Sequence, residues 1–168
     1  ARPDDITTIW FRAGVIIGSG SASFEIIRNL SQKLPVMVTP RWVNTKTQPI
    51  AVDDVLSYLE ESVSLENTGN TVVDIGADIM SFRGMMVAAG KVMGLKRFII
   101  PVPVLSPKLS SYWLVLITTV PFKMAAALVE GLKSETVKQN DNAALLFPKI
   151  KPVSFVHAVQ HAIDEIEK

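Results

Sequence analysis

The amino-acid sequence predicts a single α/β domain that spans residues 1–168. Short runs rich in β-branched and aromatic residues alternate with segments whose apolar residues recur at helical spacing, which is typical of strands connected by helices. The length of 168 residues suits one domain with a sizeable core. The sequence is 48% hydrophobic, so either the core is generous or an apolar face meets a partner, a second copy or a further part of the same protein.

The first part of the chain is expected to contain three extended segments and two helices. The extended segments are residues 6–17, 35–40 and 47–52. Periodic apolar residues indicate a helix over residues 22–33, which Ser21 or Ser23 could cap. A second helix begins near Asp53, and its apolar positions are Val55, Leu56, Leu59 and Val63.

The remainder is expected to contain two strands and four helices. The strands are residues 71–76 and 97–104, and between them a helix runs from Ser81 to about Met93 and stops at Gly94. Further helices are expected at residues 107–118, 121–132 and 154–167. Four methionines on or beside the helix from Ser81 are expected to fill core space: Met80, Met85, Met86 and Met93.

Composition excludes several classes of function. The net charge of +1 gives no electrostatic attraction to nucleic acid. The chain has no cysteine, which excludes disulfides, thiolate metal sites and cysteine nucleophiles. No apolar run reaches the length of a transmembrane helix, so we expect none. These features are compatible with a cytoplasmic protein.

Two clusters of titratable residues each have an ordinary and a functional interpretation. Asp53 and Asp54 are consistent with a paired-carboxylate site, but helix capping is the favoured interpretation because neighbouring helix residues do not face each other. His157 and His161 have the i, i+4 spacing of two metal ligands, with Asp164 nearby. Without a third ligand or an HExxH pattern, a solvated helix face is the favoured interpretation.

Arg12 and the stretch GSGSAS at residues 18–23 are the remaining candidates for ligand contact. An arginine within an apolar strand needs a partner, so Arg12 is expected to pair with Asp53 or Asp74, the alternative being a ligand phosphate. The stretch GSGSAS lies between a strand and a helix, where backbone amides can bind an anion. It matches neither GxGxxG nor a P-loop, so it is a candidate ligand loop only through its place at a strand end.

Three stretches in order resemble the C-terminal half of extended and atypical short-chain dehydrogenases/reductases. TTIWFRAGVIIGSG resembles their strand of apolar residues with an arginine and a final glycine. QPIAVDDVLSYL resembles their strand-to-helix junction, with Ile50, Val52 and Asp54 on the pattern. GNTVVDIGADIMSFRGMMVAAGKVMG resembles a later strand that ends in glycine before a Ser- or Thr-capped helix. The resemblance is greatest to NmrA-like proteins, the nucleotide-binding subunit of respiratory complex I, and epimerase-like NAD(P)H-binding proteins.

This resemblance implies the C-terminal part of a Rossmann-like NAD(P)-binding fold, with its substrate-side helices and short strands. In the family, the glycine-rich loop and the Tyr–Lys pair precede the arginine strand, so we expect this chain to be a substrate-side portion. NAD or NADP would then bind the full-length protein and only weakly this chain. Val15 and Thr47 stand where nucleotide-sugar epimerases carry an asparagine and an arginine. The resemblance therefore implies an apolar or quinone-like ligand.

Three functions remain open at this point. The first is the substrate-side portion of an NAD(P)-dependent oxidoreductase or epimerase-like protein, inactive alone. The second is a non-catalytic NAD(P)-sensing or assembly module, and the third is a small α/β interaction domain. A homo-oligomer is expected in each case, because an apolar surface is left uncovered. The residues expected to line the substrate cleft are Arg12, Gly18, Ser19, Ser21, Arg41, Trp42 and Gln48.

Overall fold

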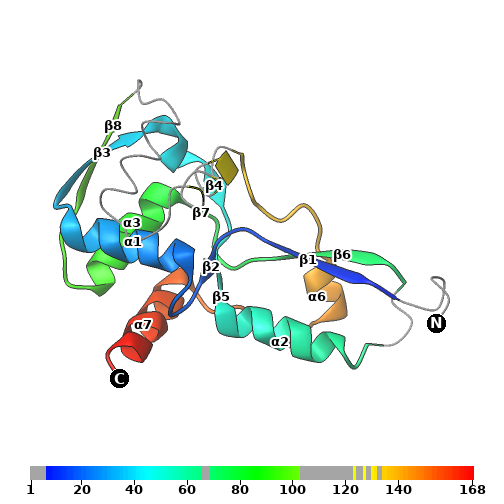
Figure 1. Ribbon diagram of the computed structural model, residues 1–168. Coiled ribbons are helices and arrows are strands. Elements are labelled where there is room, and N and C mark those ends of the chain that lie inside the picture. The colour runs from blue at the N-terminus through cyan, green and yellow to red at the C-terminus, as the bar shows by residue number, and fades with distance from the viewer. Residues whose placement is uncertain (1–6, 66–68, 103–122, 124–126, 128–129, 132–133) are drawn as a thin grey trace.

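The computed structural model describes residues 7–65, 69–102, 123, 127, 130–131 and 134–168. For five of these residues it describes the backbone alone: Val38, Pro40, Arg41, Pro101 and Val102. Helices and short strands alternate along the chain, which confirms the α/β class (Figure 1). The helices expected at residues 107–118 and 121–132 lie outside the described residues or extend beyond them.

The described strands pair two by two, and three of the four pairs are parallel. The parallel pairs are β1 (Ile9–Ala13) with β6 (Thr71–Ile75), β2 (Ile16–Ile17) with β5 (Ile50–Ala51), and β3 (Val36–Pro40) with β8 (Phe98–Val102). The antiparallel pair is β4 (Lys46–Thr47) with β7 (Met80–Ser81). The expected strand over residues 6–17 is therefore interrupted, and its two parts pair with different strands.

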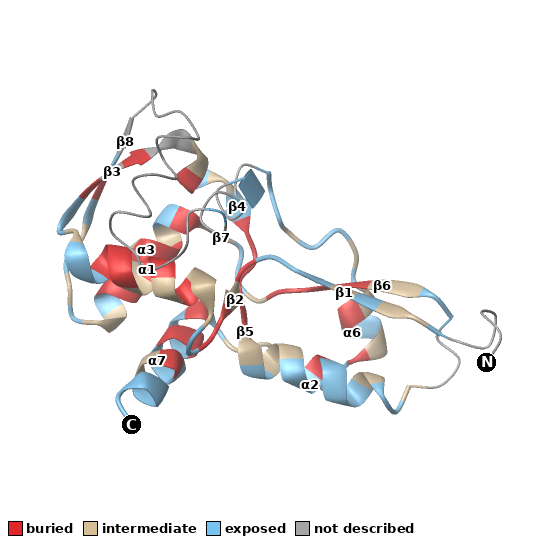
Figure 2. Ribbon diagram, in the orientation of Figure 1, coloured by how far each residue is buried: buried red, intermediate tan, exposed pale blue. Residues whose placement is uncertain are grey.

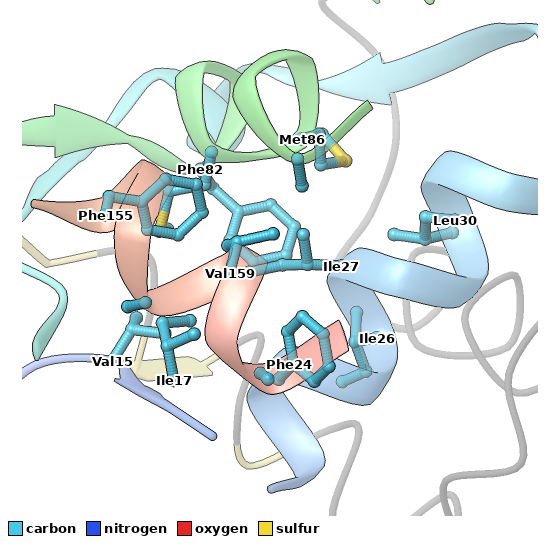
Figure 3. Packing of buried hydrophobic residues seen from close by; sticks show 14 of the residues in the cluster. Val15, Ile17, Phe24, Ile26, Ile27, Leu30, Phe82, Met86, Phe155 and Val159 are labelled. Atoms are coloured by element: carbon cyan, nitrogen blue, oxygen red, sulfur yellow. The ribbon is translucent and has the colours of Figure 1, made fainter. Parts of the chain in front are cut away.

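Three helices build the larger hydrophobic core. They are α1 (Ala22–Lys33), α3 (Phe82–Val92) and α7 (Phe155–Ile166), and their apolar faces meet as Figure 3 shows. The pair β3–β8 and the 3-10 helix η2 (Arg41–Asn44) adjoin this core. Met85 and Met86 are fully buried, as expected for gap-filling methionines.

A second, smaller core lies beneath the β1–β6 pair. Helices α2 (Val52–Ser62) and α6 (Asn142–Leu146) lie beside this pair in Figure 1. Phe11, Tyr58 and Phe147 contact one another here, with ring centroids 5.3–6.0 Å apart. The sequence pattern did not indicate α6, which is only five residues long.

Local capping signals are confirmed at two helices and wrong at a third. The Ser21 and Ser81 hydroxyls cap α1 and α3, and Gly94 has the positive φ of 70° that ends α3. At α2 the N-cap residue is Ala51, which makes no side-chain cap. Asp53 and Asp54 lie in the first helical turn, where their negative charges interact favourably with the helix dipole. Neither side chain caps a backbone amide of the helix.

None of the helices in the described part of the chain has both the length and the apolar character needed to cross a bilayer.

Candidate ligand site at the carboxyl ends of the parallel strands

A cleft of about 540 Å³ lies at the carboxyl ends of β1 and β6. Its walls are residues 11–14 at the end of β1, Asp74 and Ile75 at the end of β6, and the segment 135–139. Ligands of open parallel sheets bind at the carboxyl edge of the strands. This strand-end cleft is therefore the candidate ligand site.

Arg12 and Asp74 form an ion pair in the wall of this cleft. The two residues are direct neighbours in the parallel register of β1 and β6. Arg12 Nε donates to Asp74 Oδ1 at 2.6 Å, and Arg12 Nη2 donates to Asp74 Oδ2 at 3.0 Å. The expected structural pairing of Arg12 is thus confirmed, with Asp74 and not Asp53 as its partner. The guanidinium remains open to the cleft, because 58% of the Arg12 side chain is exposed.

Asp74 is the buried partner and holds the opposite wall in place. Its side chain is 5% exposed, and Oδ2 also accepts a hydrogen bond from Gln139 N at 2.7 Å. The hydrogen bonds from Arg12 hold the pKa of this carboxyl below its usual range, and the pKa of Arg12 is raised by the same pairing. Asp74 is therefore a carboxylate at neutral pH and does not supply a proton to a ligand.

Gln48 also holds the segment 135–139 in place, through a hydrogen bond to its backbone. Its side chain is buried: Oε1 accepts from Lys138 N at 2.7 Å, and Nε2 donates to Ala77 O at 3.0 Å. Both ends of the carboxamide are thus engaged by backbone groups. The residue shapes the strand-end cleft by positioning its wall, and it contributes no lining atom to it.

Close packing at Gly14 was not anticipated from the sequence. A Cβ atom at this position would lie 2.7 Å from Thr47 Oγ1 and 3.2 Å from the backbone oxygens of Gln48 and Thr136. The Thr47 and Thr136 hydroxyls form a hydrogen bond of 2.6 Å beside it. A glycine inside a strand-like run signals such close approach, and this signal was available in the sequence as Arg-Ala-Gly.

The loop at residues 18–21 lies at the end of the neighbouring strand β2. Gly18 is buried against Val52, and a Cβ there would lie 2.5 Å from Val52 Cγ1. The Ser21 hydroxyl donates to Ile16 O and accepts from Phe24 N, so capping occupies it. Ser19 is exposed. Neither serine lines the strand-end cleft.

A second, smaller cleft of about 190 Å³ lies where β2 and β5 end. Asp53 and Asp54 of α2 face His157 and His161 of α7 across it, and His161 Nδ1 lies 3.3 Å from Asp53 Oδ2. Burial raises the pKa of Asp54, although Val153 N donates to its Oδ2 at 2.9 Å. Asp164 is turned toward Gln160. Among the described residues no group of potential ligands could hold a metal ion.

The remaining expected site residues lie in the 3-10 helix η2, away from both clefts. Trp42 is partly buried and packs on Phe82, with ring centroids 5.9 Å apart. It belongs to the larger core and lines neither cleft described above. Arg41 begins η2, and its side chain lies outside what the structure describes. Of the expected site residues, Arg12 lines the strand-end cleft, Gln48 positions its wall, and Gly18 lines the smaller cleft. Ser19, Ser21 and Trp42 line neither cleft.

Comparison of sequences gives no relative for this chain. No protein-family model matches it, and no curated protein matches it.

Comparison of structures finds many proteins with a similar arrangement. Human epimerase family protein SDR39U1, solved with NADPH, has 15% identity and a TM-score of 0.65, covering 96% of this chain and 50% of that chain. Citrobacter sp. triphenylmethane reductase has 17% identity and a TM-score of 0.64, covering 88% and 51%. Bacillus cereus UDP-glucuronic acid 4-epimerase, solved with UDP-glucuronic acid and NAD, has 15% identity and a TM-score of 0.62, covering 97% and 46%.

The chain thus spans about half the length of the solved structures that it matches. At these identities the likeness concerns the fold. The described strands and helices therefore have a Rossmann-like fold that corresponds to about half of each of these solved structures.

Proposed function

We propose that this chain is the substrate-side portion of an NAD(P)-dependent oxidoreductase or epimerase-like protein and is inactive by itself. The observation that supports this most is the β1–β6 pair. It is parallel, it ends in the strand-end cleft, and it is only two strands wide among the described residues. Sheets of globular proteins usually have about four to six strands, so we take this pair to be part of a larger sheet.

In this proposal, NAD or NADP is held mainly by a cofactor-binding half with its own glycine-rich loop. The strand-end cleft then borders the reacting end of the cofactor, because ligands of open α/β sheets bind beyond the carboxyl ends of the strands. The chain contributes the exposed guanidinium of Arg12 as a hydrogen-bond donor. The Asp74 carboxylate and the Gln48 carboxamide hold the segment that closes the cleft.

The ligand is proposed to be apolar or quinone-like. Val15 is buried in the larger core, so it presents no polar atom to a ligand. Thr47 is buried and its hydroxyl is bonded to Thr136. Neither position can anchor a nucleotide diphosphate, which argues against a nucleotide sugar.

A second candidate is a non-catalytic NAD(P)-sensing or assembly module. It is favoured by the engagement of Asp74 and Gln48, which are tied to other protein groups at the strand-end cleft. Glu135 and Lys138 are the other titratable residues that line this cleft, and both are exposed. Catalysis would then depend on them or on groups from the cofactor-binding half.

Turnover by the longer polypeptide of the same reading frame separates these candidates. The protein is mixed with NADH or NADPH and either a quinone or a simple carbonyl compound, and oxidation of the cofactor is followed by its absorbance. Quinone-dependent oxidation supports the enzyme. Cofactor binding without turnover supports the sensing or assembly module, and failure to bind either dinucleotide contradicts both.

A further inference from the structure

Helix α2 carries apolar side chains that the described protein leaves uncovered. Tyr58 is 3% exposed and packs in the smaller core, whereas Leu56, Leu59 and Val63 beside it are 57%, 46% and 86% exposed. Figure 2 shows α2 as largely exposed or intermediate along its length. The three exposed residues are here called the α2 flank.

The α2 flank continues the buried face of the helix around one side. At about 100° per residue, the apolar positions form one sector of about 160° that starts at Tyr58, passes Leu59 and ends at Leu56. A helix that covers a single layer needs an apolar stripe of about 100°. Apart from Ser62, whose hydroxyl donates to Leu59 O, the polar residues occupy the other side of α2. The pattern therefore suits contact with two neighbours: the sheet and a second element beside the flank.

Hydrogen bonds indicate at which edge of the β1–β6 pair a further strand could be added. On the outer edge of β6, Asn142 Nδ2 donates to Val72 O at 2.8 Å, and Asn140 Oδ1 accepts from Asp74 N at 3.4 Å. These side chains occupy two of the backbone groups that a further strand would need. We therefore expect the sheet to be extended beyond β1.

The other edge of β1 is open among the described residues. Thr71 N donates to Thr8 O, so the alternation of a parallel ladder turns the backbone groups of Ile9 and Phe11 away from β6. No described strand pairs with this edge. A strand added there in parallel needs a crossover helix to cover it, and α2 already lies in the helix layer that covers β1 through Tyr58 and Phe11.

We propose that a helix of the cofactor-binding half packs against the α2 flank, as that half extends the sheet beyond β1. This inference rests on the proposed function, and on the finding that similar structures are about twice as long as this chain. Glu60 borders the flank, and α2 contains no basic residue. The docking helix therefore carries an apolar stripe edged by lysine or arginine.

The test compares Leu59→Glu with Leu145→Glu in the longer polypeptide of the same reading frame. Leu145 on α6 is 75% exposed and serves as the matched control. If a helix covers the flank, Leu59→Glu lowers the Tm by about 5 °C, while Leu145→Glu and the apolar replacement Leu59→Met leave it within about 1 °C. In the 168-residue chain alone, both glutamate variants melt like the parent.

Titration of NADH and NADPH into the same variants keeps the two proposals apart. Dinucleotide binding with an unchanged Tm for Leu59→Glu overturns the docking surface and leaves the proposed function standing. A lowered Tm without dinucleotide binding supports the docking surface and contradicts the proposed function. If Leu59→Glu instead converts a dimer of the 168-residue chain into a monomer and has no effect on the longer polypeptide, the occupant is a second copy and the inference is wrong.

Discussion

Asp74 links three separate parts of the chain, and this makes it the most informative residue to change. Its carboxylate bonds Arg12 on β1 and Gln139 on the segment that closes the strand-end cleft. Asp74→Ala leaves both donors without this acceptor. We expect a loss of about 1–3 kcal/mol in the free energy of unfolding, measured by urea denaturation. Asp141→Ala removes an exposed carboxylate and is the control; equal effects of the two changes would contradict the role given to Asp74.

The ionisation of Asp74 predicts how that contribution depends on pH. Because pairing with Arg12 lowers the pKa of Asp74 in the folded protein, its stabilisation is complete above the unfolded pKa of about 3.9 and is lost as the pH falls through the folded value. The Tm of the parent should exceed that of Asp74→Asn by a constant amount from pH 7 to about pH 5. The difference should close at lower pH. A difference that does not begin to shrink below the unfolded pKa of about 3.9 would mean that charge is not its source.

At the scale of single residues, local chemistry was predictable and long-range pairing was not. Ser21, Ser81 and Gly94 act within a few residues of their position, so the sequence was enough to assign them. Arg12 needed a carboxylate, but the choice between Asp53 and Asp74 depends on which strand lies beside β1. The backbone bonds of Gln48 depend on where the distant segment at Lys138 crosses it, and no local pattern reports that.

Among the secondary-structure elements, the break between β1 and β2 is the feature on which the strand-end cleft depends. Gly14 lets Thr47 and Thr136 approach the chain there. Gly14→Ala is expected to destabilise the fold by about 1–3 kcal/mol, because the added methyl group must displace Thr47 or the backbone beside it.

A matched glycine in a helix gives the opposite expectation. At Gly84 in α3, an added Cβ would meet its nearest neighbour at 3.5 Å, which is ordinary contact. Gly84→Ala should therefore stabilise the protein by up to about 1 kcal/mol through helix propensity. Urea denaturation of the two variants measures both effects. A Gly14→Ala variant as stable as the parent would show that the close packing at β1 is not needed.

Periodic helices were predictable at the element scale, while strand pairing was only partly so. Helix α7 follows directly from the spacing of Phe155, Val159 and Ala162. The strand expected over residues 6–17 has the right composition, yet it divides because Gly14 separates residues that pair with β6 from residues that pair with β5. Helix α6 is too short to produce a periodic signal.

At the scale of the whole molecule, the described chain has the surfaces of an incomplete sheet. One edge of β1 lacks a partner among the described residues, and Trp10 on that strand is 56% exposed. The high apolar fraction of the sequence was compatible with either a generous core or an uncovered apolar face. Its position on β1 and α2 could not be predicted, because it depends on the tertiary arrangement of strands and helices.

Titration of the 168-residue chain with NADH and NADPH, followed by cofactor fluorescence, tests the central claim most directly. If the groups that bind the cofactor belong to the cofactor-binding half, this chain alone shows no saturable binding up to a dinucleotide concentration of about 1 mM. Saturable binding by this chain with a Kd of about 1 μM would contradict the claim, because the described strand-end cleft would then hold the cofactor unaided.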